Sequence, residues 1–225
     1  MRRFALYFSF LLFPGAGLCS HMQAQAMSPL AGKPQKGATN SNVDVAASFI
    51  NVMLYGAKGD GVTDDTAAIQ AAMSSGGRCA PGSCQSSTTT PAIVYFPAGT
   101  YIVNSSIIDY YYTQIIGNPN SMPVLKATPN FSGFGIIDGD QYGGNGLKFG
   151  ATDVFYRQIR NLIFDLTAIP ASSSATGVHW PTAQATSLQN CVFLMSDAPG
   201  TQHQGLFIEN GVSVLLTKVG HLLMG

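Results

Sequence analysis

Charged residues are scarce in this chain, which has 11 lysines and arginines and 11 aspartates and glutamates among 225 residues. The net charge is zero and no basic stripe runs along the sequence, so nucleic acid is excluded as an expected partner. Glutamate occurs once, at Glu209. Low charge combined with many Gly, Ser, Thr, Asn and aromatic residues is typical of a β-rich protein that meets neutral sugars.

Long apolar runs are also lacking. The apolar run of residues 4–13 is too short to span a bilayer. It follows two arginines and precedes a small-x-small site at residues 24–26, so residues 1–26 are predicted to be a secretory signal peptide, with a membrane anchor as the alternative. We expect residues 27–48 to form a flexible mature N-terminus. The protein is then secreted and has no membrane contact after signal removal.

Several catalytic motifs are missing as well. No Gly-x-Ser-x-Gly, His-Glu-x-x-His or P-loop pattern occurs, so serine-hydrolase chemistry, zinc-dependent hydrolysis and phosphoryl transfer have no support. We expect no metal ion and no cofactor. Asp138 and Asp140 lie in a glycine-containing segment that could form a polar loop near a sugar, but their spacing is weak for calcium.

Cysteine is rare too, with four residues of which Cys19 falls in the predicted signal peptide. Cys79 and Cys84 are five positions apart, and in an oxidising compartment such a tight loop can close a disulfide. A metal site would need further ligands nearby, and the sequence places none there. Cys191 lies in an apolar strand and is expected to be buried.

Residues 51–73 predict a short apolar strand, a glycine-rich turn and a capped helix. Val52 and Leu54 alternate with polar neighbours, and three glycines follow within seven residues. Thr63 or Asp64 can cap a helix that runs to residue 73. After residue 90 the chain is instead a series of short strands separated by glycine and asparagine.

Two segments of this strand-rich part recur at nearly constant offsets. Residues 160–164 are similar to residues 189–193, 29 positions later, and residues 177–180 are similar to residues 205–208, 28 positions later. Stacked coils of a solenoid produce such a constant offset, with an asparagine at each tight corner. Coincidence between two short matches is the alternative.

The strand–turn–helix segment and the strand near residues 93–101 resemble the start of a pectate-lyase-like, right-handed parallel β-helix. The resemblance implies an all-β domain over residues 49–211, an incomplete solenoid with one short N-terminal helix. Later segments are similar to the N-terminal β-helix of glycoside hydrolase family 55, the fungal exo-β-1,3-glucanases. These segments are residues 78–84, 177–180, 183–190 and 203–211.

This resemblance implies two β-helical domains with β-1,3-glucan bound in the cleft between them. The glucan would be hydrolysed from its non-reducing end with inversion, which requires an acid and a water activated on the opposite face of the sugar. In the family the acid is a glutamate of the second domain. We therefore expect this chain, as a monomer, to be inactive alone.

Gln184 is the best candidate for a catalytic role. It matches a family segment in which a glutamine positions the attacking water, and an amide can both donate to and accept from that water. The alternative is a ladder of amide side chains between coils. The family places a serine after residues 209–211, whereas Val212 stands there in this chain.

Four further residues are candidates for binding the substrate. His179 and Trp180 lie shortly before Gln184, and an exposed indole would stack on a sugar, with core packing as the alternative. His203 and Gln204 could line a sugar cleft or belong to a solvated loop. Glu209 could act in catalysis, but a carboxylate at a strand end more commonly fixes a turn.

Residues 212–225 depart from the family pattern, and we interpret this tail as translated intron sequence, with a genuine alternative terminus as the other explanation. Three functions remain open. The chain is the N-terminal portion of a secreted β-1,3-glucanase, a non-catalytic glucan-binding or vestigial fragment, or a pectin-active β-helix. The last would need an Asp cluster with calcium and arginine, or a pair of aspartates on adjacent coils, and the sequence offers neither convincingly.

Overall fold

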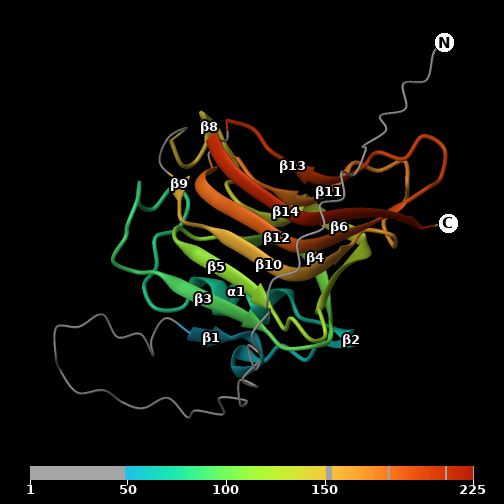
Figure 1. The fold of residues 1–225 in the computed structure, drawn as a ribbon, viewed down its shortest axis with the longest axis horizontal. Helices are drawn as coiled ribbons and strands as arrows, with labels where there is room; N and C mark the ends of the chain where they lie inside the picture. The colour runs from blue at the N-terminus through green and yellow to red at the C-terminus, as the bar shows by residue number, and fades with distance from the viewer. Residues whose placement is uncertain (1–48, 151–153, 182, 211, 225) are drawn as a thin grey trace, which may run out of the picture. The chain divides into compact units, whose positions relative to one another are not determined.

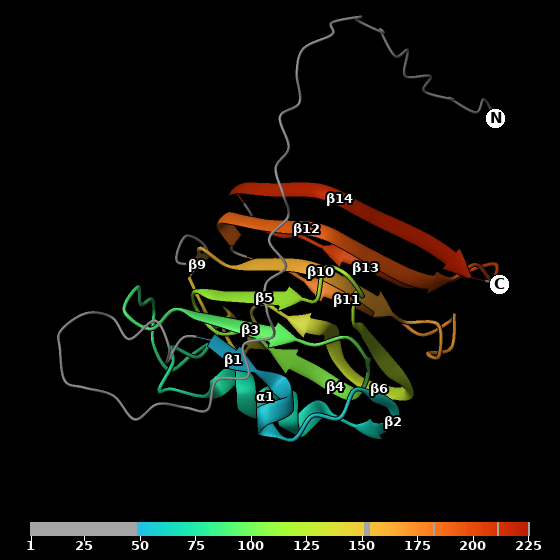
Figure 2. The same ribbon diagram turned by 60° about the horizontal axis from the view of Figure 1, so that its bottom comes forward.

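The computed structural model describes residues 49–150, 154–181, 183–210 and 212–224. Its main sheet is parallel throughout and winds into a solenoid with three faces, which we name A, B and C. Figures 1 and 2 show the strands of face A stacked in the order β1, β3, β5, β10, β12, β14. The right-handed parallel β-helix expected from the sequence is confirmed.

Long strands turn a corner of the solenoid and so contribute to two faces. Face A is formed by β1 (Phe49–Asn51), β3 (Ala92–Phe96), β5 (Thr113–Gly117) and the first halves of β10 (Gln158–Asp165), β12 (Ala183–Ser196) and β14 (Val212–Met224). Face B is formed by β2 (Asp60–Asp64), the first halves of β4 (Thr100–Ile108) and β6 (Val124–Asp138), and the second halves of β10, β12 and β14. Face C is formed by the second halves of β4 and β6, then β11 (Ala175–His179) and β13 (His203–Phe207).

Two small elements complete the strands. β9 (Val154–Phe155) pairs with the start of β12, and β7 (Tyr142–Gly143) forms an antiparallel hairpin with β8 (Gly146–Leu147). The hairpin is inserted after β6 on face C. It lengthens that coil relative to the coils that follow.

The strand pairing confirms the repeat in the sequence. Arg160 pairs with Gln189 and Phe164 with Phe193, which is the offset of 29. His179 pairs with Phe207, which is the offset of 28. A constant sequence offset therefore corresponds to one coil of the solenoid.

Asparagines occupy the corner between faces A and B, as predicted. Asn161 and Asn190 both have positive φ, 56° and 51°, a conformation that asparagine tolerates better than most residues. Asn190 Nδ2 donates to Asn161 Oδ1 at 2.9 Å, and Asn161 Nδ2 donates to the carbonyl of Gly117 at 3.3 Å. In β14 the same corner is Lys218, with φ of 50°, so the amide ladder does not extend to that coil.

The first strand lies earlier than predicted, at Phe49–Asn51, and the residues expected to form it adopt a turn instead. Residues 52–55 form a 3₁₀ turn, η1 (Val52–Tyr55), because the Asn51 side chain accepts from the Met53 backbone N–H at its start and Gly56 adopts φ of 104° at its end. Leu54, expected in a strand, is exposed.

The helix α1 (Thr66–Ser74) begins two residues later than predicted. Asp65 occupies the N-cap position, but its carboxylate accepts from the backbone N–H groups of Lys58 and Gly59 at 2.6 and 3.0 Å. Asp64, one of the two predicted caps, accepts from the Thr66 N–H at 3.0 Å. Asp65 therefore stabilises the glycine-rich turn, and Asp64 caps the start of the helix.

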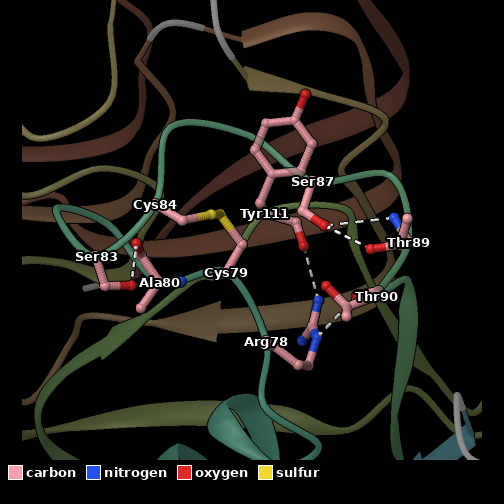
Figure 3. Close-up of a disulfide and its surroundings, with 9 residues drawn as sticks. All are labelled: Arg78, Cys79, Ala80, Ser83, Cys84, Ser87, Thr89, Thr90 and Tyr111. Carbon is pink, nitrogen blue, oxygen red and sulfur yellow. Dashed lines mark hydrogen bonds between the residues drawn. A yellow bond between two sulfur atoms is a disulfide. The ribbon is translucent and has the colours of Figure 1, made fainter.

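Cys79 and Cys84 form the predicted disulfide, and Cys191 is free and buried as expected. Figure 3 shows the disulfide beside Tyr111, against which Cys79 packs. The buried Arg78 side chain donates to the carbonyls of Met73 and Tyr111 at 3.0 and 2.9 Å. Because Arg78 adjoins the disulfide, this network ties the loop after α1 to the coil containing β5.

Aromatic rings on one face of the solenoid interior lie opposite glycines on another face. Phe164, Phe193 and His221 stack from coil to coil on face B, with ring centroids 5.1 and 5.4 Å apart. Opposite them on face C lie Gly177 and Gly205. A Cβ at Gly177 would lie 2.5 Å from Phe193, so glycine is required there by packing rather than by backbone conformation.

Candidate functional site

The candidate site lies where the strands of face C end. Backbone pairing continues one residue past these strands, with Gly139 N–H donating to the His179 carbonyl at 2.8 Å and Trp180 N–H to the Phe207 carbonyl at 2.8 Å. Asp138, His179 and Phe207 are therefore neighbours in one row across three coils. Side chains in such a row point the same way, which brings residues 28 and 41 positions apart into contact.

The imidazole of His179 lies between two carboxylates. Nδ1 is 2.9 Å from Asp138 Oδ1, and Nε2 is 3.2 Å from Glu209 Oε1. The hydroxyl of Tyr142 also donates to Glu209 Oε1. A doubly protonated ring can donate to both carboxylates, whereas a neutral ring can donate to only one. We call Asp138, Tyr142, His179 and Glu209 the histidine cluster.

Aromatic rings cover the histidine. Phe134 lies 4.1 Å from the imidazole centroid, and Tyr142 and Phe207 stack on it at 5.4 and 5.6 Å. His179 has no exposed surface, while Phe134 is 39% and Tyr142 49% exposed. The hydrogen bond to Glu209 raises the pKa of Tyr142 to about 12, so its hydroxyl stays a donor at neutral pH.

A groove runs beside the histidine cluster. It has a volume of about 350 Å³, and its lining has no charged residue. Besides the small residues Gly133 and Ala175, the lining is aromatic or neutral polar, namely Phe134, Phe207, Ser174, Thr176, Gln202 and Gln204. Ser174 donates to Gln202 Oε1 at 2.9 Å. Hydroxyls and amides next to aromatic rings are the groups that bind a neutral, hydroxyl-rich ligand.

A buried ion pair lies near the histidine cluster. Asp109 and Arg157 form an ion pair at 3.4 Å in which neither side chain is exposed. Arg157 donates to the Gly139 carbonyl and stands over the Trp180 ring at 4.6 Å. Burial raises the pKa of Asp109, and the positive charge of Arg157 opposes that shift. We call Asp109 and Arg157 the sealed pair.

Asp140 connects the site to the β7–β8 hairpin. Its carboxylate accepts from the backbone N–H groups of Lys148 and Phe149 at 3.1 and 3.0 Å. Burial raises the pKa of Asp140 to about 6 in spite of these bonds. Because the hairpin carries Tyr142, Asp140 helps to position the tyrosine of the histidine cluster.

His179 and Trp180, which are adjacent in the sequence, have different surroundings in the structure. His179 joins the histidine cluster, but Trp180 is fully buried and donates from Nε1 to Thr186 Oγ1 at 3.0 Å. A sugar cannot stack on an indole with no exposed face, so the proposed platform is wrong and the alternative, core packing, holds. Gln184 is half-buried at the start of β12, paired with Phe155 and Val212. Its role in positioning water stays a prediction.

His203 and Gln204 also differ from each other. His203 is buried, with Nδ1 accepting from the Ser196 N–H at 3.2 Å and Nε2 3.3 Å from the Pro170 carbonyl. These partners fit the neutral ring protonated on Nε2, which fastens two loops and does not line a cleft or a solvated loop. Gln204 is exposed and lines the groove.

The sequence did not identify Phe134, Tyr142 or Asp138 as partners of His179. Asp138 was noticed only as a member of a polar loop. Within the described ranges, no group of three or more His, Cys, Asp or Glu side chains is arranged to hold a metal ion. No helix in the described part of the chain is long and apolar enough to cross a membrane.

Comparisons with known proteins give the family. The family model described as "Rhamnogalacturonase A/epimerase, pectate lyase-like" matches residues 49–223. A glucan 1,3-beta-glucosidase of Cochliobolus carbonum is 47% identical over 187 residues, covering 82% of this chain and 24% of the relative. A probable glucan endo-1,3-beta-glucosidase of Arthroderma benhamiae is 51% identical over 174 residues, covering 76% of this chain and 20% of the relative.

A solved structure agrees on the fold. The A-module of the mannuronan C-5 epimerase AlgE4 of Azotobacter vinelandii superposes with a TM-score of 0.56 at 19% identity, covering 76% of this chain and 44% of the module. At this identity the likeness concerns the fold alone. The chain spans about a quarter or less of the length of the two glucosidase relatives.

Proposed function

Because the chain belongs to the pectate-lyase-like family of rhamnogalacturonase A and epimerases, we propose that it forms one wall of a β-1,3-glucan site in a secreted glycoside hydrolase. The names of the two glucosidase relatives support the substrate. The chain corresponds to the N-terminal portion of such an enzyme, which is exo-acting and inverting according to the family resemblance.

The observation that carries this proposal is the uncharged groove on face C. Pectin is a polyuronate, and its carboxylates would call for lysine, arginine or calcium along the groove. The groove instead has glutamines, hydroxyls and two phenylalanines, and the neighbouring Asp138 and Glu209 would repel a uronate. A neutral glucan fits this lining better than pectin does.

Hydrolysis needs more than this wall. Inversion requires an acid and a positioned water on opposite faces of the sugar. Gln184 is proposed to hold the water, and the acid is expected from a second β-helical domain. The serine expected beside Gln184 is replaced by Val212, so the water site is incomplete on this side as well. We therefore propose that the chain binds glucan but does not hydrolyse it alone.

Two measurements test the proposal. The purified chain should be retained on insoluble β-1,3-glucan and not on polygalacturonate, and its release of glucose from laminarin should stay near background. Retention on polygalacturonate alone would favour the pectin-active alternative. Strong glucose release that survives Gln184→Ala would overturn both the proposed inactivity and the role of Gln184.

The non-catalytic alternative depends on the C-terminal segment. β14 pairs with β12 from Gln184 to Ser196, and the family model matches as far as residue 223. We nevertheless propose that residues 212–225 are translated intron, because the Ser-Gly-Gly that the resemblance to glycoside hydrolase family 55 implies after Gly211 is absent. Sequencing of the cDNA across the Gly211 codon tests this. A message that continues as Ser-Gly-Gly supports the glucanase, and one that encodes Val212 through Gly225 favours a glucan-binding or vestigial fragment.

Secretion has its own test. We propose that residues 1–26 are removed as a signal peptide. The N-terminal sequence of protein recovered from the culture medium should begin at residue 27. Protein found only inside cells, with residue 1 intact, would contradict the proposal.

A further inference from the structure

Glu209 is held from one side only. Among the described residues, both hydrogen bonds to this carboxylate end on Oε1, one from His179 and one from Tyr142. The side chain is 26% exposed, so the second oxygen, Oε2, is accessible while the carboxylate is fixed in orientation. An acceptor that is fixed in this way needs little ordering when a ligand binds.

Phe134 links this carboxylate to the groove. It lines the groove, packs on His179 and lies 5.7 Å from the ring of Tyr142. Tyr142 therefore lies at the rim of the groove, and Glu209, which accepts the hydrogen bond from its hydroxyl, lies there too. No charged residue lines the groove itself. The rim combines a half-exposed aromatic face with an anchored acceptor.

We propose that Tyr142 and Glu209 form a subsite for one neutral hexose unit at this rim. Glu209 Oε2 accepts hydrogen bonds from sugar hydroxyls, and the ring of Tyr142 packs against the apolar face of the sugar. His179 is a positioning residue, because it has no exposed surface and acts by holding Glu209. This inference rests on the proposed function. It adds Tyr142, His179 and Glu209 to the glucan site and does not involve Gln184.

The carboxylates also decide which sugars fit. Glu209 and Asp138 lie 3.2 and 2.9 Å from the same imidazole, which can compensate at most one negative charge. The histidine cluster therefore carries a net negative charge when both carboxylates are ionised. A neutral glucose unit is accepted at such a rim, whereas a uronate would be repelled.

The test is calorimetric titration of the full chain with laminarihexaose. Glu209→Gln keeps the shape of the side chain but removes its charge, and we expect affinity to fall about tenfold, the usual loss for a hydrogen bond to a charged group. Tyr142→Phe keeps the ring and frees Oε1, and we expect a loss of about threefold. Tyr156→Phe is the matched control, because Tyr156 is similarly exposed, at 46%, and is not part of the groove.

The outcomes separate this inference from the proposed function. Binding by the wild-type chain that is unchanged in Glu209→Gln, with a lower melting temperature, would make Glu209 a brace for the turn and overturn the subsite alone. Absence of binding by the wild-type chain to laminarihexaose would overturn the proposed glucan site and the subsite with it. Weaker binding by both rim variants but not by Tyr156→Phe supports the subsite.

Discussion

The sealed pair and the histidine cluster are built from similar groups and lie on either side of Gly139, yet they have different exposure. Asp109 and Arg157 are both fully buried, and the guanidinium is further held by the Gly139 carbonyl and the Trp180 ring. In the histidine cluster the imidazole is equally buried, but one carboxylate and the tyrosine reach solvent. The same chemistry can therefore serve the fold in one place and a ligand in the other, and access to solvent decides which.

The polar atoms that lack a hydrogen-bond partner also differ between the sealed pair and the histidine cluster. Asp109 Oδ2 and Arg157 Nε have no hydrogen-bond partner among the described residues, and no ligand could reach them. Such a pair is stable only while both charges are present, because either one alone would be buried without compensation. Glu209, by contrast, can exchange water for a ligand at Oε2.

The largest effect is expected in the sealed pair. Asp109→Asn removes the main counter-charge of the buried Arg157 and leaves only the weaker interactions with Asp140 and Asp138, which should lower the free energy of unfolding by about 3–5 kcal/mol. Urea denaturation followed by far-UV circular dichroism measures this. The control is Asp197→Asn, an exposed carboxylate, for which about 0.5 kcal/mol or less is expected. A loss below about 1 kcal/mol in Asp109→Asn would mean that the pair is not sealed.

A pH dependence should come from Asp140, whose carboxylate interacts electrostatically with Arg157 of the sealed pair and Asp138 of the histidine cluster. Its folded pKa of about 6 is above the unfolded value of 3.8, so the contribution of Asp140 to stability is fully present below pH 3.8 and is lost as the pH rises through 6. Between pH 4 and 7 the melting temperature of the wild-type chain should therefore decline more than that of Asp140→Asn. We expect a difference of a few degrees.

If both proteins show the same decline over this range, Asp140 does not titrate near pH 6. The isosteric asparagine can still accept hydrogen bonds from the hairpin backbone, which keeps Tyr142 in place. The comparison of the two melting curves thus isolates the titration of one carboxyl from that of the others.

The smallest effect on stability is expected at Glu209, the partly exposed carboxylate of the histidine cluster. Glu209→Gln should lower the free energy of unfolding by only about 1 kcal/mol, because the side chain is partly solvated and the amide oxygen can still accept from Tyr142. The urea titration described for Asp109→Asn measures the loss in the free energy of unfolding for Glu209→Gln as well, so the two losses can be compared. Equal losses in the two variants would erase the distinction between a structural and a ligand-facing cluster.

Much of the fold follows from local patterns. The offsets of 28 and 29 residues predicted the pairing of β10 with β12 and of β11 with β13, because each coil there has nearly the same length. The asparagine corner follows from the same offset of 29 residues, and the disulfide joins cysteines only five positions apart. The 3₁₀ turn of residues 52–55 was missed because the Asn51 side chain and Gly56 outweigh the alternation of Val52 and Leu54.

The candidate site was harder to predict, for a physical reason. His179 was named from the sequence, but its partner Asp138 lies 41 positions earlier, not 28 or 29, because the β7–β8 hairpin lengthens that coil. Tyr142 lies on the same hairpin and reaches the site only through the fold. For Trp180 the sequence left a stacking surface and core packing open, because the burial of a lone tryptophan depends on the coil in which it packs.

The pairing of Gly177 with Phe193 has a consequence for how this solenoid can change its sequence. Both residues belong to one coil, and the phenyl ring fills the space that a side chain at residue 177 would occupy. A Cβ at residue 177 would also lie 2.6 Å from the Gly205 carbonyl oxygen, on the neighbouring strand of face C. A smaller residue at position 193 should therefore act only as a partial second-site suppressor of Gly177→Ala, because it removes the clash with the ring and leaves the clash with the backbone.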